Sequence, residues 1–510
     1  MTGSGRPTPP FAFGSGDVGD VRSRFGREVA VDDALADRLA GVCEEVVTST
    51  GSLVEAGRDW WPLSVSWGVA GEVPALPAVV ARPRSAAEVA AVLAVCDAGG
   101  VPVTAAAGRS GVCGGSVPVF GGVALDLTGL AGMVAVDDLS LTVEVRAGTF
   151  GDDFEAELGA AHGLTLGHWP QSMAMSTVGG WLACRSAGQY STRYGKIEDL
   201  VVGLEVALAD GRVIRTGARA PRAAAGPDLT SLFVGSEGTL GVITEARLRV
   251  RPRPTGERSA VYGFASFADG LDACRRVLRR GATPAVVRLY DAAESARQFH
   301  VEDRAVLLVF DEADPALVGP VATVVAEECG AAERLDSSLV EQWLAHRNEV
   351  APLAALAREG IVADTIEIAA SWTALPAIYG ASIAALSALD GTVVASAHQS
   401  HAYPDGACLY FTFAGTPTPA GASSSGGGSG NAADIYYCQA WDAVMSATLA
   451  HGGALSHHHG VGINRGRYLA GALGPAFEVL ASVKAALDPR GILNPGKLGL
   501  PSPFGEAPWP

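Results

Sequence analysis

The chain has 510 residues, of which 48% are hydrophobic and 18% charged, a composition typical of a folded protein with two or three domains. Its formal net charge of −17 at pH 7 disfavours nucleic acid as a partner, because an acidic surface repels phosphate backbones. Any anionic ligand must therefore be held by local donors, such as backbone N–H groups and single arginines. The eight cysteines are scattered without a C-x-x-C pair, which indicates reduced thiols rather than a zinc site or a disulfide framework.

The first residues lack the basic start and apolar core of a secretory signal, so we expect a cytoplasmic protein. The longest uncharged run, Ile368 to Leu389, is long enough to span a bilayer. It is rich in Ala, Ser and Thr, however, and it contains Pro376 and Gly380. We expect a buried helix of a soluble protein there, and no transmembrane segment.

In chain order, the composition and periodicity predict five parts. They are a tail over 1–20, a helical segment over 21–73, a first α+β domain over 74–254, a second over 255–455, and a C-terminal segment over 456–510. Within the second domain, the Gly- and Ser-rich stretch 421–433 is predicted as a flexible insertion.

Local signals in the first domain predict short strands and helices. Ser85 followed by Glu88 forms a capping-box pattern before a helix over Glu88 to Ala98. Strands are expected over 78–81, 101–104, 122–126, 141–145 and 241–250. The pair Asp210-Gly211 predicts a hairpin turn between strands over 204–209 and 213–216.

Three segments of this domain combine glycines, hydroxyl residues and tight turns. They are Thr104–Gly115, Gly167–Trp181 and Gly235–Thr244. A strand that enters a Gly-rich loop can present consecutive N–H groups to an anion, because absent side chains allow close approach. Each segment alone is equally typical of an ordinary turn, and none matches a G-x-G-x-x-G or P-loop pattern.

Together, the order and spacing of these segments resemble the PCMH-type FAD-binding domain of the vanillyl-alcohol-oxidase superfamily. The resemblance is closest to the alkyldihydroxyacetonephosphate synthases. It rests on STVGGW, YGKIEDLVV and GSEGTLGVITEA, and it continues through VVRLYD, Asp364–Glu367, GACLYF and SHHHGVG. It implies an α+β fold with a two-subdomain FAD-binding domain, a substrate (cap) domain, and a C-terminal segment that returns to the flavin site. It also implies a small-molecule or lipid-like substrate and a possible homodimer.

The same resemblance implies which residues would bind FAD. The pyrophosphate would lie at the first loop, the flavin and ribityl chain at the second and at the helix that follows, and the adenosine side at the third. The residues are Thr104, Ala105, Ala106, Ala107, Gly108, Arg109, Ser110, Gln171, Ser172, Met173, Ala174, Met175, Ser176, Thr177, Cys184, Arg185, Ser186, Ala187, Glu237, Gly238, Thr239, Leu240, Gly241, Val242 and Ile243. No histidine occupies the position at which related oxidases attach flavin, so non-covalent FAD is expected, and Cys113 is expected to be a small buried thiol.

The resemblance assigns catalysis to Tyr410, which would move a proton, to the triplet His457, His458 and His459, and to Arg288, which would orient the substrate. Each has an alternative interpretation. Tyr410 lies in LYFTF, which is also typical of a plain strand, and Arg288 could form an ion pair with Asp291. The triplet could be a metal site or a core cluster, but in extended chain at most two consecutive side chains converge, so no metal ligand is assigned.

Two departures bear on the activity. Related 2-hydroxy-acid dehydrogenases have a second metal-binding His where this chain has Tyr410, and a Glu where it has His458. The synthases place a phosphate-binding arginine where this chain has Leu353, with Arg347 and Arg358 out of register. We therefore expect synthase-like chemistry, with a flavin N5 adduct and exchange of an acyl for an alkyl group. The alternative is an FAD-dependent oxidase or dehydrogenase of a 2-hydroxy acid or small alcohol.

Overall fold

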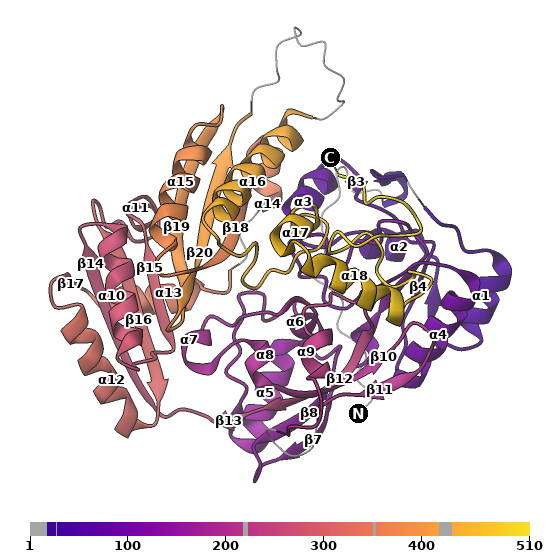
Figure 1. Cartoon of the computed structure of the whole chain (residues 1–510), viewed down its shortest axis with the longest axis horizontal. Helices are drawn as coiled ribbons and strands as arrows, with labels where there is room; N and C mark the ends of the chain where they lie inside the picture. Colours follow the sequence, from indigo (N-terminus) through magenta and orange to yellow (C-terminus); the bar gives the residue numbers. More distant parts are fainter. Residues whose placement is uncertain (1–17, 27, 218–222, 350–352, 418–430, 510) are drawn as a thin grey trace, which may run out of the picture.

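The computed structural model describes residues 18–26, 28–217, 223–349, 353–417 and 431–509. Most of the predicted tail 1–20 and of the predicted insertion 421–433 lies outside these ranges. Figure 1 shows the first half of the chain on one side and the sheet of residues 256–415 on the other. The C-terminal segment, in yellow, runs back over the first half.

The first subdomain is built on a four-stranded sheet in the order β2-β4-β6-β5, in which β4, β6 and β5 are parallel. Helix α4 packs in the same core, and its start is capped by Ser85, whose hydroxyl accepts a hydrogen bond from the Glu88 N–H at 3.2 Å. This confirms the predicted capping pattern. The elements are β2 Val46–Val47, β4 Val79–Ala81, α4 Ala86–Gly99, β5 Val103–Ala106 and β6 Val123–Asp126.

The segment before it, predicted as helical, also contributes short strands. Besides α1 Asp33–Ala40, α2 Thr50–Ala56 and α3 Pro62–Val69, it contains β1 Arg22–Ser23 and β3 Glu72–Val73, and η1 Val18–Asp20 ends the predicted tail. Strand β2 pairs with β4, so residues before 74 complete the first sheet. The helical prediction was therefore incomplete, because a two-residue edge strand leaves no period in the sequence.

The second subdomain is an antiparallel five-stranded sheet in the order β11-β10-β12-β8-β7. The Asp210-Gly211 hairpin is confirmed, since β10 pairs with β11 on either side of it and Gly211 has φ +85°. The elements are η2 Leu127–Gly129, β7 Met133–Asp137, β8 Thr142–Arg146, α5 Gly151–His162, β9 Leu164–Thr165, α6 Val178–Cys184, α7 Ser191–Tyr194, α8 Ile197–Leu200, β10 Val201–Ala207, β11 Val213–Arg215, α9 Leu229–Phe233, β12 Val242–Arg249 and β13 Arg251–Pro252.

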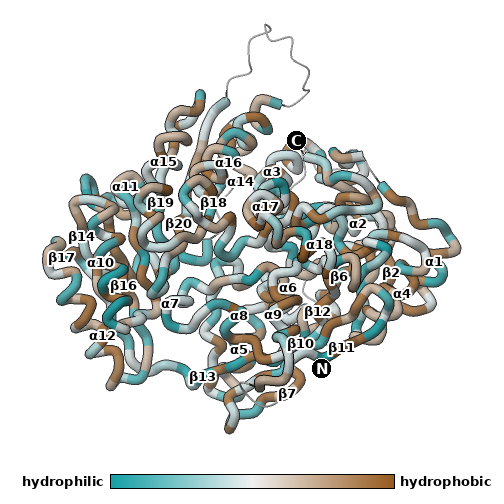
Figure 2. Tube along the Cα trace, in the orientation of Figure 1, coloured by the Kyte–Doolittle hydropathy of each residue, from teal (hydrophilic) through white to brown (hydrophobic). Residues whose placement is uncertain are grey.

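The cap is a seven-stranded antiparallel sheet in the order β17-β14-β16-β15-β19-β20-β18. Hydrophobic and hydrophilic positions alternate along α10, which buries Leu271, Val277 and Leu278 (Figure 2). The elements are β14 Gly256–Phe264, α10 Phe267–Arg279, β15 Val286–Tyr290, α11 Ala292–Phe299, β16 Ala305–Ala313, α12 Pro315–Glu328, β17 Glu333–Leu335, α13 Ser338–His346, α14 Leu353–Arg358, β18 Val362–Ser371, α15 Leu375–Ser387, β19 Thr392–Ala402, β20 Gly406–Gly415 and α16 Ala432–Ala450.

The prediction of one buried helix over Ile368–Leu389 was wrong. Its first residues finish β18, where Ile368 pairs with Leu409 of β20, and α15 begins only at Leu375 with Pro376 in its first turn. A strand partner far away in sequence thus overrides the local composition. Among the described residues, no single helix has the length and apolarity needed to cross a membrane. One bent pair, Gly466–Leu473 and Ala476–Leu487, reaches that threshold only when both helices are counted together.

The C-terminal segment joins the first half of the chain. After α17 Gly466–Leu473 and α18 Ala476–Leu487, Ile492 and Leu493 enter the core beside β5, with Leu493 forming a parallel bridge to Val103. Asn494 Nδ2 donates to the carbonyl oxygens of Gly115 and Glu237, at 3.0 and 2.6 Å. The segment therefore ties the first and third Gly-rich stretches together.

Candidate active site

A row of polar residues crosses one face of the cap sheet. Glu367 on β18 pairs with Tyr410 on β20, Tyr410 pairs with His398 on β19, and His398 pairs with Tyr290 on β15. Directly opposed residues of neighbouring strands share a face, so these four side chains line one side of the sheet. Leu409, Phe411 and Phe413 are fully buried in the core. LYFTF is therefore a strand that buries its apolar side chains in the core and places Tyr410 on the opposite face.

Tyr410 begins a chain of hydrogen-bonding groups. Its hydroxyl lies 2.9 Å from Nε2 of His459, and Nδ1 of His459 lies 3.9 Å from Oε1 of Glu367. Burial raises the pKa of the Tyr410 phenol well above its usual value and lowers the pKa of His459 to about 4. Both groups are therefore neutral at physiological pH, and Nδ1 of His459 has no hydrogen-bond partner among the described residues.

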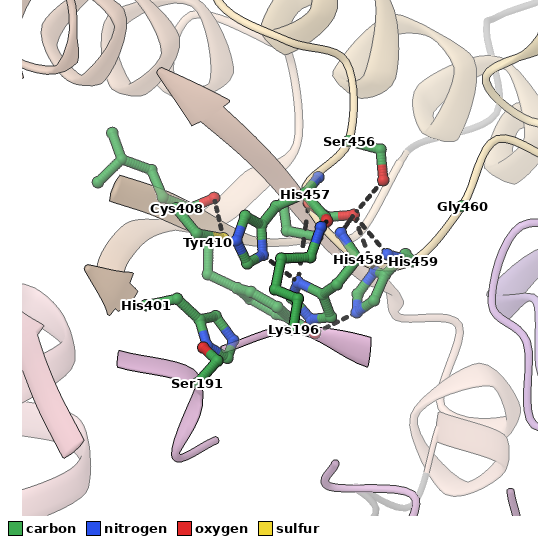
Figure 3. A network of polar contacts seen from close by, with 12 residues as sticks. Ser191, Lys196, His401, Cys408, Tyr410, Ser456, His457, His458, His459 and Gly460 are labelled. Atoms are coloured by element: carbon green, nitrogen blue, oxygen red, sulfur yellow. Dashed lines mark hydrogen bonds and ion pairs between the residues drawn. The ribbon is translucent and has the colours of Figure 1, made fainter. Parts of the chain in front are cut away.

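Glu367 holds the backbone of the histidine triplet. Its fully buried carboxylate accepts hydrogen bonds from the N–H groups of His457, His458 and His459, and from the Ser456 hydroxyl at 2.7 Å. Figure 3 shows His457, His458 and His459 gathered beside Tyr410. Burial alone would raise the pKa of Glu367, but Arg465 at 3.2 Å, His459 and these donors lower it, so the carboxylate stays ionised.

A second buried carboxylate holds the other end of the same stretch, which we call the histidine segment (Ser456–Gly462). Glu237 accepts from the N–H groups of Val461 and Gly462, at 2.5 and 2.8 Å. Arg465, also fully buried, donates to the Gly460 carbonyl at 2.7 Å and to the Glu367 carbonyl at 3.0 Å. The histidine segment is therefore fixed from the cap sheet and from the FAD-binding half at once.

The other two histidines of the triplet meet a third from β19. Nδ1 of His457 and Nδ1 of His458 are 3.0 Å apart, and nitrogen atoms of these rings and of His401 all lie within 4.8 Å of one another. His401 is held by the Ser191 hydroxyl at 2.7 Å, and the His457 carbonyl accepts from Lys196 Nζ at 2.5 Å. Burial lowers the pKa of all three imidazoles well below the usual value.

This grouping agrees with the expectation that at most two of the triplet converge. It also forms a metal-compatible arrangement, because His401 supplies the third nitrogen that the triplet alone could not provide. The assignment of no metal ligand stays a prediction.

Arg288 lies beside Tyr410 and does not pair with Asp291. Its Nε donates to the Tyr290 hydroxyl at 2.7 Å, and its Nη2 lies 2.5 Å from His398 Nε2. His398 Nδ1 lies 3.1 Å from Glu294, and the His398 ring stacks on Tyr410 at 5.0 Å between centroids. Asp291 instead caps α11 by accepting from the Glu294 N–H.

The first Gly-rich loop, Gly108–Gly115, has the backbone expected of an anion site, and we call it the donor loop. Within the described residues, none of its N–H groups donates a hydrogen bond to any protein atom. Arg109 has φ +51° and is 8% exposed, yet its Nε and Nη2 make no hydrogen bond to the described residues. A Cβ at Gly108 would collide with the Met175 carbonyl. These orphaned donors fit a diphosphate such as that of FAD.

Several other residues expected at the cofactor have structural roles for their side chains. Ser176 accepts from the Trp181 indole at 2.7 Å, Thr177 caps α6, and Glu237 holds the histidine segment. Other expected cofactor residues lie in hydrophobic cores: Met173, Leu240, Val242 and Ile243. Thr104, Ala105 and Ala106 form the strand that enters the donor loop, and Ala107 follows it. The side chains of these residues therefore also take part in the packing and hydrogen bonding of the fold.

The remaining expected residues lie near the histidine segment or at the surface. Cys184 contacts the Gly460 position, since a Cβ there would lie 3.4 Å from the Cys184 Cβ. Arg185 is exposed and pairs with Glu198 at 3.4 Å, and Ser186 lies 3.2 Å from His168 Nε2. Gln171 and Ala174 are exposed, whereas Ser172, Met175, Ser110 and Gly238 are partly buried and Ala187, Thr239 and Gly241 are buried. Cys113 is buried as expected, and all eight cysteines are unpaired.

Sequence reasoning did not assign Glu367, His401 or Lys196 to the site. Glu367 belongs to the Asp364–Glu367 motif and Lys196 to YGKIEDLVV, so both lie in segments that carried the resemblance. Their roles depend on strand register and on contacts across more than ninety residues, for example His459 N–H to Glu367. A buried Glu in an otherwise apolar strand was the available signal.

Comparison with known proteins defines the class first. Residues 77–217 match the model of the FAD binding domain, and residues 253–498 match the FAD linked oxidases, C-terminal domain. With the donor loop and the fold described above, the chain is an FAD-binding flavoenzyme with the PCMH-type two-domain fold. A solved alkyldihydroxyacetonephosphate synthase has the same fold, with 22% identity, a TM-score of 0.77, and coverage of 96% of this chain and 90% of that one.

The particular family follows from the curated relatives. The uncharacterized FAD-linked oxidoreductase YgcU of Escherichia coli is 31% identical over 83% of this chain and 89% of its own length. The chain belongs to this FAD-linked oxidoreductase family. It is also similar to glycolate oxidase subunit GlcD of Bacillus subtilis (29%; 87% of this chain, 92% of that protein) and to alkyldihydroxyacetonephosphate synthase of Trypanosoma brucei brucei (28%; 76% and 66%).

Proposed function

We propose that this flavoenzyme performs the synthase type of reaction, in which an alkoxy group replaces an acyloxy group on a carbon next to a carbonyl. The C–O bond to the leaving fatty acid breaks, a C–O bond to a fatty alcohol forms, and the proton of the alcohol leaves with the carboxylic acid. No net oxidation or reduction occurs. The observation that carries the proposal is the Tyr410–His459–Glu367 chain, in which the phenol hydroxyl lies 2.9 Å from His459.

Bound FAD supplies an isoalloxazine ring that can accept an electron pair from the substrate carbon. The protein supplies the proton steps. Tyr410 Oη can release its proton only while another group takes it up, because burial keeps the phenol neutral at physiological pH. His459 Nε2 contacts the Tyr410 hydroxyl and accepts its proton, and the ionised Glu367 stabilises the short-lived imidazolium that results.

We infer that other residues bind the substrate here than those that bind the phosphorylated substrate of the synthases. Leu353, at the position of the family's phosphate-binding arginine, begins α14 and is partly buried, so no guanidinium projects from that turn. Arg288 contacts the polar row of the sheet at Tyr290 and His398. We infer that it orients the substrate beside Tyr410.

A second candidate is oxidation of a 2-hydroxy acid, and one observation favours it. The convergence of His401, His457 and His458 could hold a metal ion that binds a hydroxy acid, in a family whose relatives include a D-lactate dehydrogenase at 29% identity. In this reaction the substrate loses two electrons and two protons, and FAD is reduced.

Anaerobic substrate screening of the FAD-loaded protein separates the two. Synthase chemistry predicts that labelled fatty alcohol enters an acylated ketone, detected by mass, while the flavin absorbance remains that of oxidised FAD. The second candidate would be established instead if a 2-hydroxy acid bleached that absorbance, if chelation of metal ions abolished the bleaching, and if added metal restored it. Purified protein that retains no flavin would contradict both.

A further inference from the structure

A cavity of about 370 Å³ opens between the FAD-binding half and the end of α13. Its walls include Trp169, the stretch Gln171–Met175, and Arg347. Two carboxylates, Asp152 and Glu155, also line it, and the Glu155 carboxylate accepts from the Thr165 hydroxyl and the Leu166 N–H. The cavity is therefore mostly apolar, with its acidic groups on α5, one guanidinium from Arg347 of the cap and a second from Arg253.

Arg347 is held in place by uncharged groups. Its guanidinium carbon lies 4.8, 5.8 and 5.9 Å from the ring centroids of Tyr190, Trp169 and Trp343. Its Nη1 donates to Gln189 Oε1 at 3.2 Å. Among the described residues it forms no ion pair with a carboxylate. Aromatic rings stabilise a guanidinium without neutralising it, so its remaining N–H groups are available to an anion.

Arg288 contacts the same tryptophan. Its guanidinium carbon lies 5.8 Å from the Trp343 ring, and its hydrogen-bond partners are the Tyr290 hydroxyl and His398. It too has no ion pair within the described part of the chain. Two cations that lack a directly bonded carboxylate thus share the 7%-exposed Trp343, in a protein whose formal charge is −17.

The contacts form an uninterrupted line from the cavity to the reacting tyrosine. Arg347 lines the cavity and contacts Trp343, Trp343 contacts Arg288, and Arg288 bonds His398, which stacks on Tyr410. Arginine favours carboxylate and phosphate oxygens because its planar fork can donate two parallel hydrogen bonds. An acidic surface disfavours anions wherever such local donors are missing.

We propose that Arg347, Trp343 and Arg288 form an oxyanion-recognition array that selects a substrate with a carboxylate or phosphate group and an apolar body. Arg347 binds the oxyanion in the cavity, and Arg288 orients the remainder of the substrate toward Tyr410. This proposal rests on the proposed function for the position of Tyr410. In this proposal, Arg347 at the end of α13 and Arg288 on β15 take the place of the family's arginine, which is absent near Leu353.

The test is calorimetric titration of the FAD-loaded protein with four probes: sn-glycerol 3-phosphate, octanoate, and their neutral analogues glycerol and octan-1-ol. We expect one or both anions to bind, more weakly as salt rises, and the neutral analogues to bind at least tenfold more weakly, about the size of a charge-assisted hydrogen bond. Arg347→Gln and Arg288→Gln should each weaken the anion about tenfold or more, and R347K should retain part of the affinity. Arg334→Gln is the matched control, since Arg334 lies over the Tyr262 ring in another part of the cap.

The two anions distinguish the source of the oxyanion. Binding of the phosphate probe alone assigns a phosphate ester, and binding of octanoate alone assigns a carboxylate. Equal affinity for the neutral analogues, an unchanged anion affinity in R347Q, or no binding of either anion would overturn the proposal. Tyr410→Phe separates it from the proposed function, because this variant should bind the anion as the parent does while turnover is lost.

Discussion

The donor loop (Gly108–Gly115) and the histidine segment (Ser456–Gly462) solve opposite problems with backbone N–H groups. In the donor loop these groups have no acceptor among the described residues, and the glycines let a ligand approach them. In the histidine segment, five of them are taken by Glu367 and Glu237. One loop therefore presents its backbone to a ligand, whereas the other fixes its backbone so that its side chains are presented.

The difference teaches where rigidity is needed. A diphosphate supplies the missing hydrogen-bond acceptors when it binds, so the donor loop needs no acceptors from the protein. The proton transfer proposed from Tyr410 to His459 requires the imidazole to be in place beforehand, and two buried carboxylates provide that order before any substrate arrives.

Tyr410→Phe should have the largest effect on turnover. It removes the proton donor but keeps the ring that stacks on His398, so we expect kcat to fall by about 10²- to 10⁴-fold. Bound flavin and melting temperature should match the parent. Steady-state kinetics on the substrate found by screening give the measurement. Turnover within twofold of the parent would remove Tyr410 from the mechanism.

Glu367→Gln tests the histidine segment, whose backbone is held by buried carboxylates. The amide cannot accept from three backbone N–H groups as a carboxylate does, and it leaves Arg465 buried without its charge partner. We expect a loss of about 3–5 kcal/mol in the free energy of unfolding and a clear fall in kcat, with FAD still bound. Chemical denaturation and flavin content provide the readouts. Asp488→Asn, at another buried carboxylate that accepts from two backbone N–H groups and pairs with a buried cation, Lys484, is the matched control and should leave kcat unchanged.

Gly108→Ala tests the donor loop, whose backbone N–H groups are open to a ligand. The added methyl group would meet the Met175 carbonyl, which forces the backbone apart at the donor loop. We expect FAD affinity to fall by about 10- to 100-fold, the effect of roughly 1–3 kcal/mol of steric strain. Flavin retention after gel filtration checks this. Gly380→Ala, a position with no heavy atom near the added methyl group, should retain FAD fully.

These two regions were not equally predictable. The donor loop is contiguous, so its glycines and its preceding strand could be recognised from the sequence alone. The histidine segment could be assigned to catalysis only through resemblance, because Glu367 reaches it by strand register and Glu237 by a contact over more than two hundred residues. For the same reason Glu237 was expected only at the cofactor, and the role of its carboxylate in holding Val461 and Gly462 was not foreseen.

The smallest effect concerns pH and stability near the cavity. Burial raises the pKa of the Glu155 carboxyl from 4.5 to about 7, against the pull of its hydrogen bonds with Thr165 and Leu166. Below the unfolded pKa both states are protonated, so there is no penalty. As pH rises from about 4.5 to 7, only the unfolded state ionises, and stability falls by about 3 kcal/mol at most. Glu155→Gln should flatten the fall of the melting temperature over this range, and an unchanged slope would contradict the assignment.

Hydrogen–deuterium exchange of the apo and FAD-loaded protein tests the contrast between the two loops most directly. We predict that the amides of Gly108–Gly115 exchange fast in the apo protein and slow markedly when FAD binds. The amides of His457–Gly462 should be slow in both states and become fast in E367Q, first at His457, His458 and His459. Equal exchange of the donor loop with and without FAD, or free exchange of the histidine segment in the parent protein, would contradict the account.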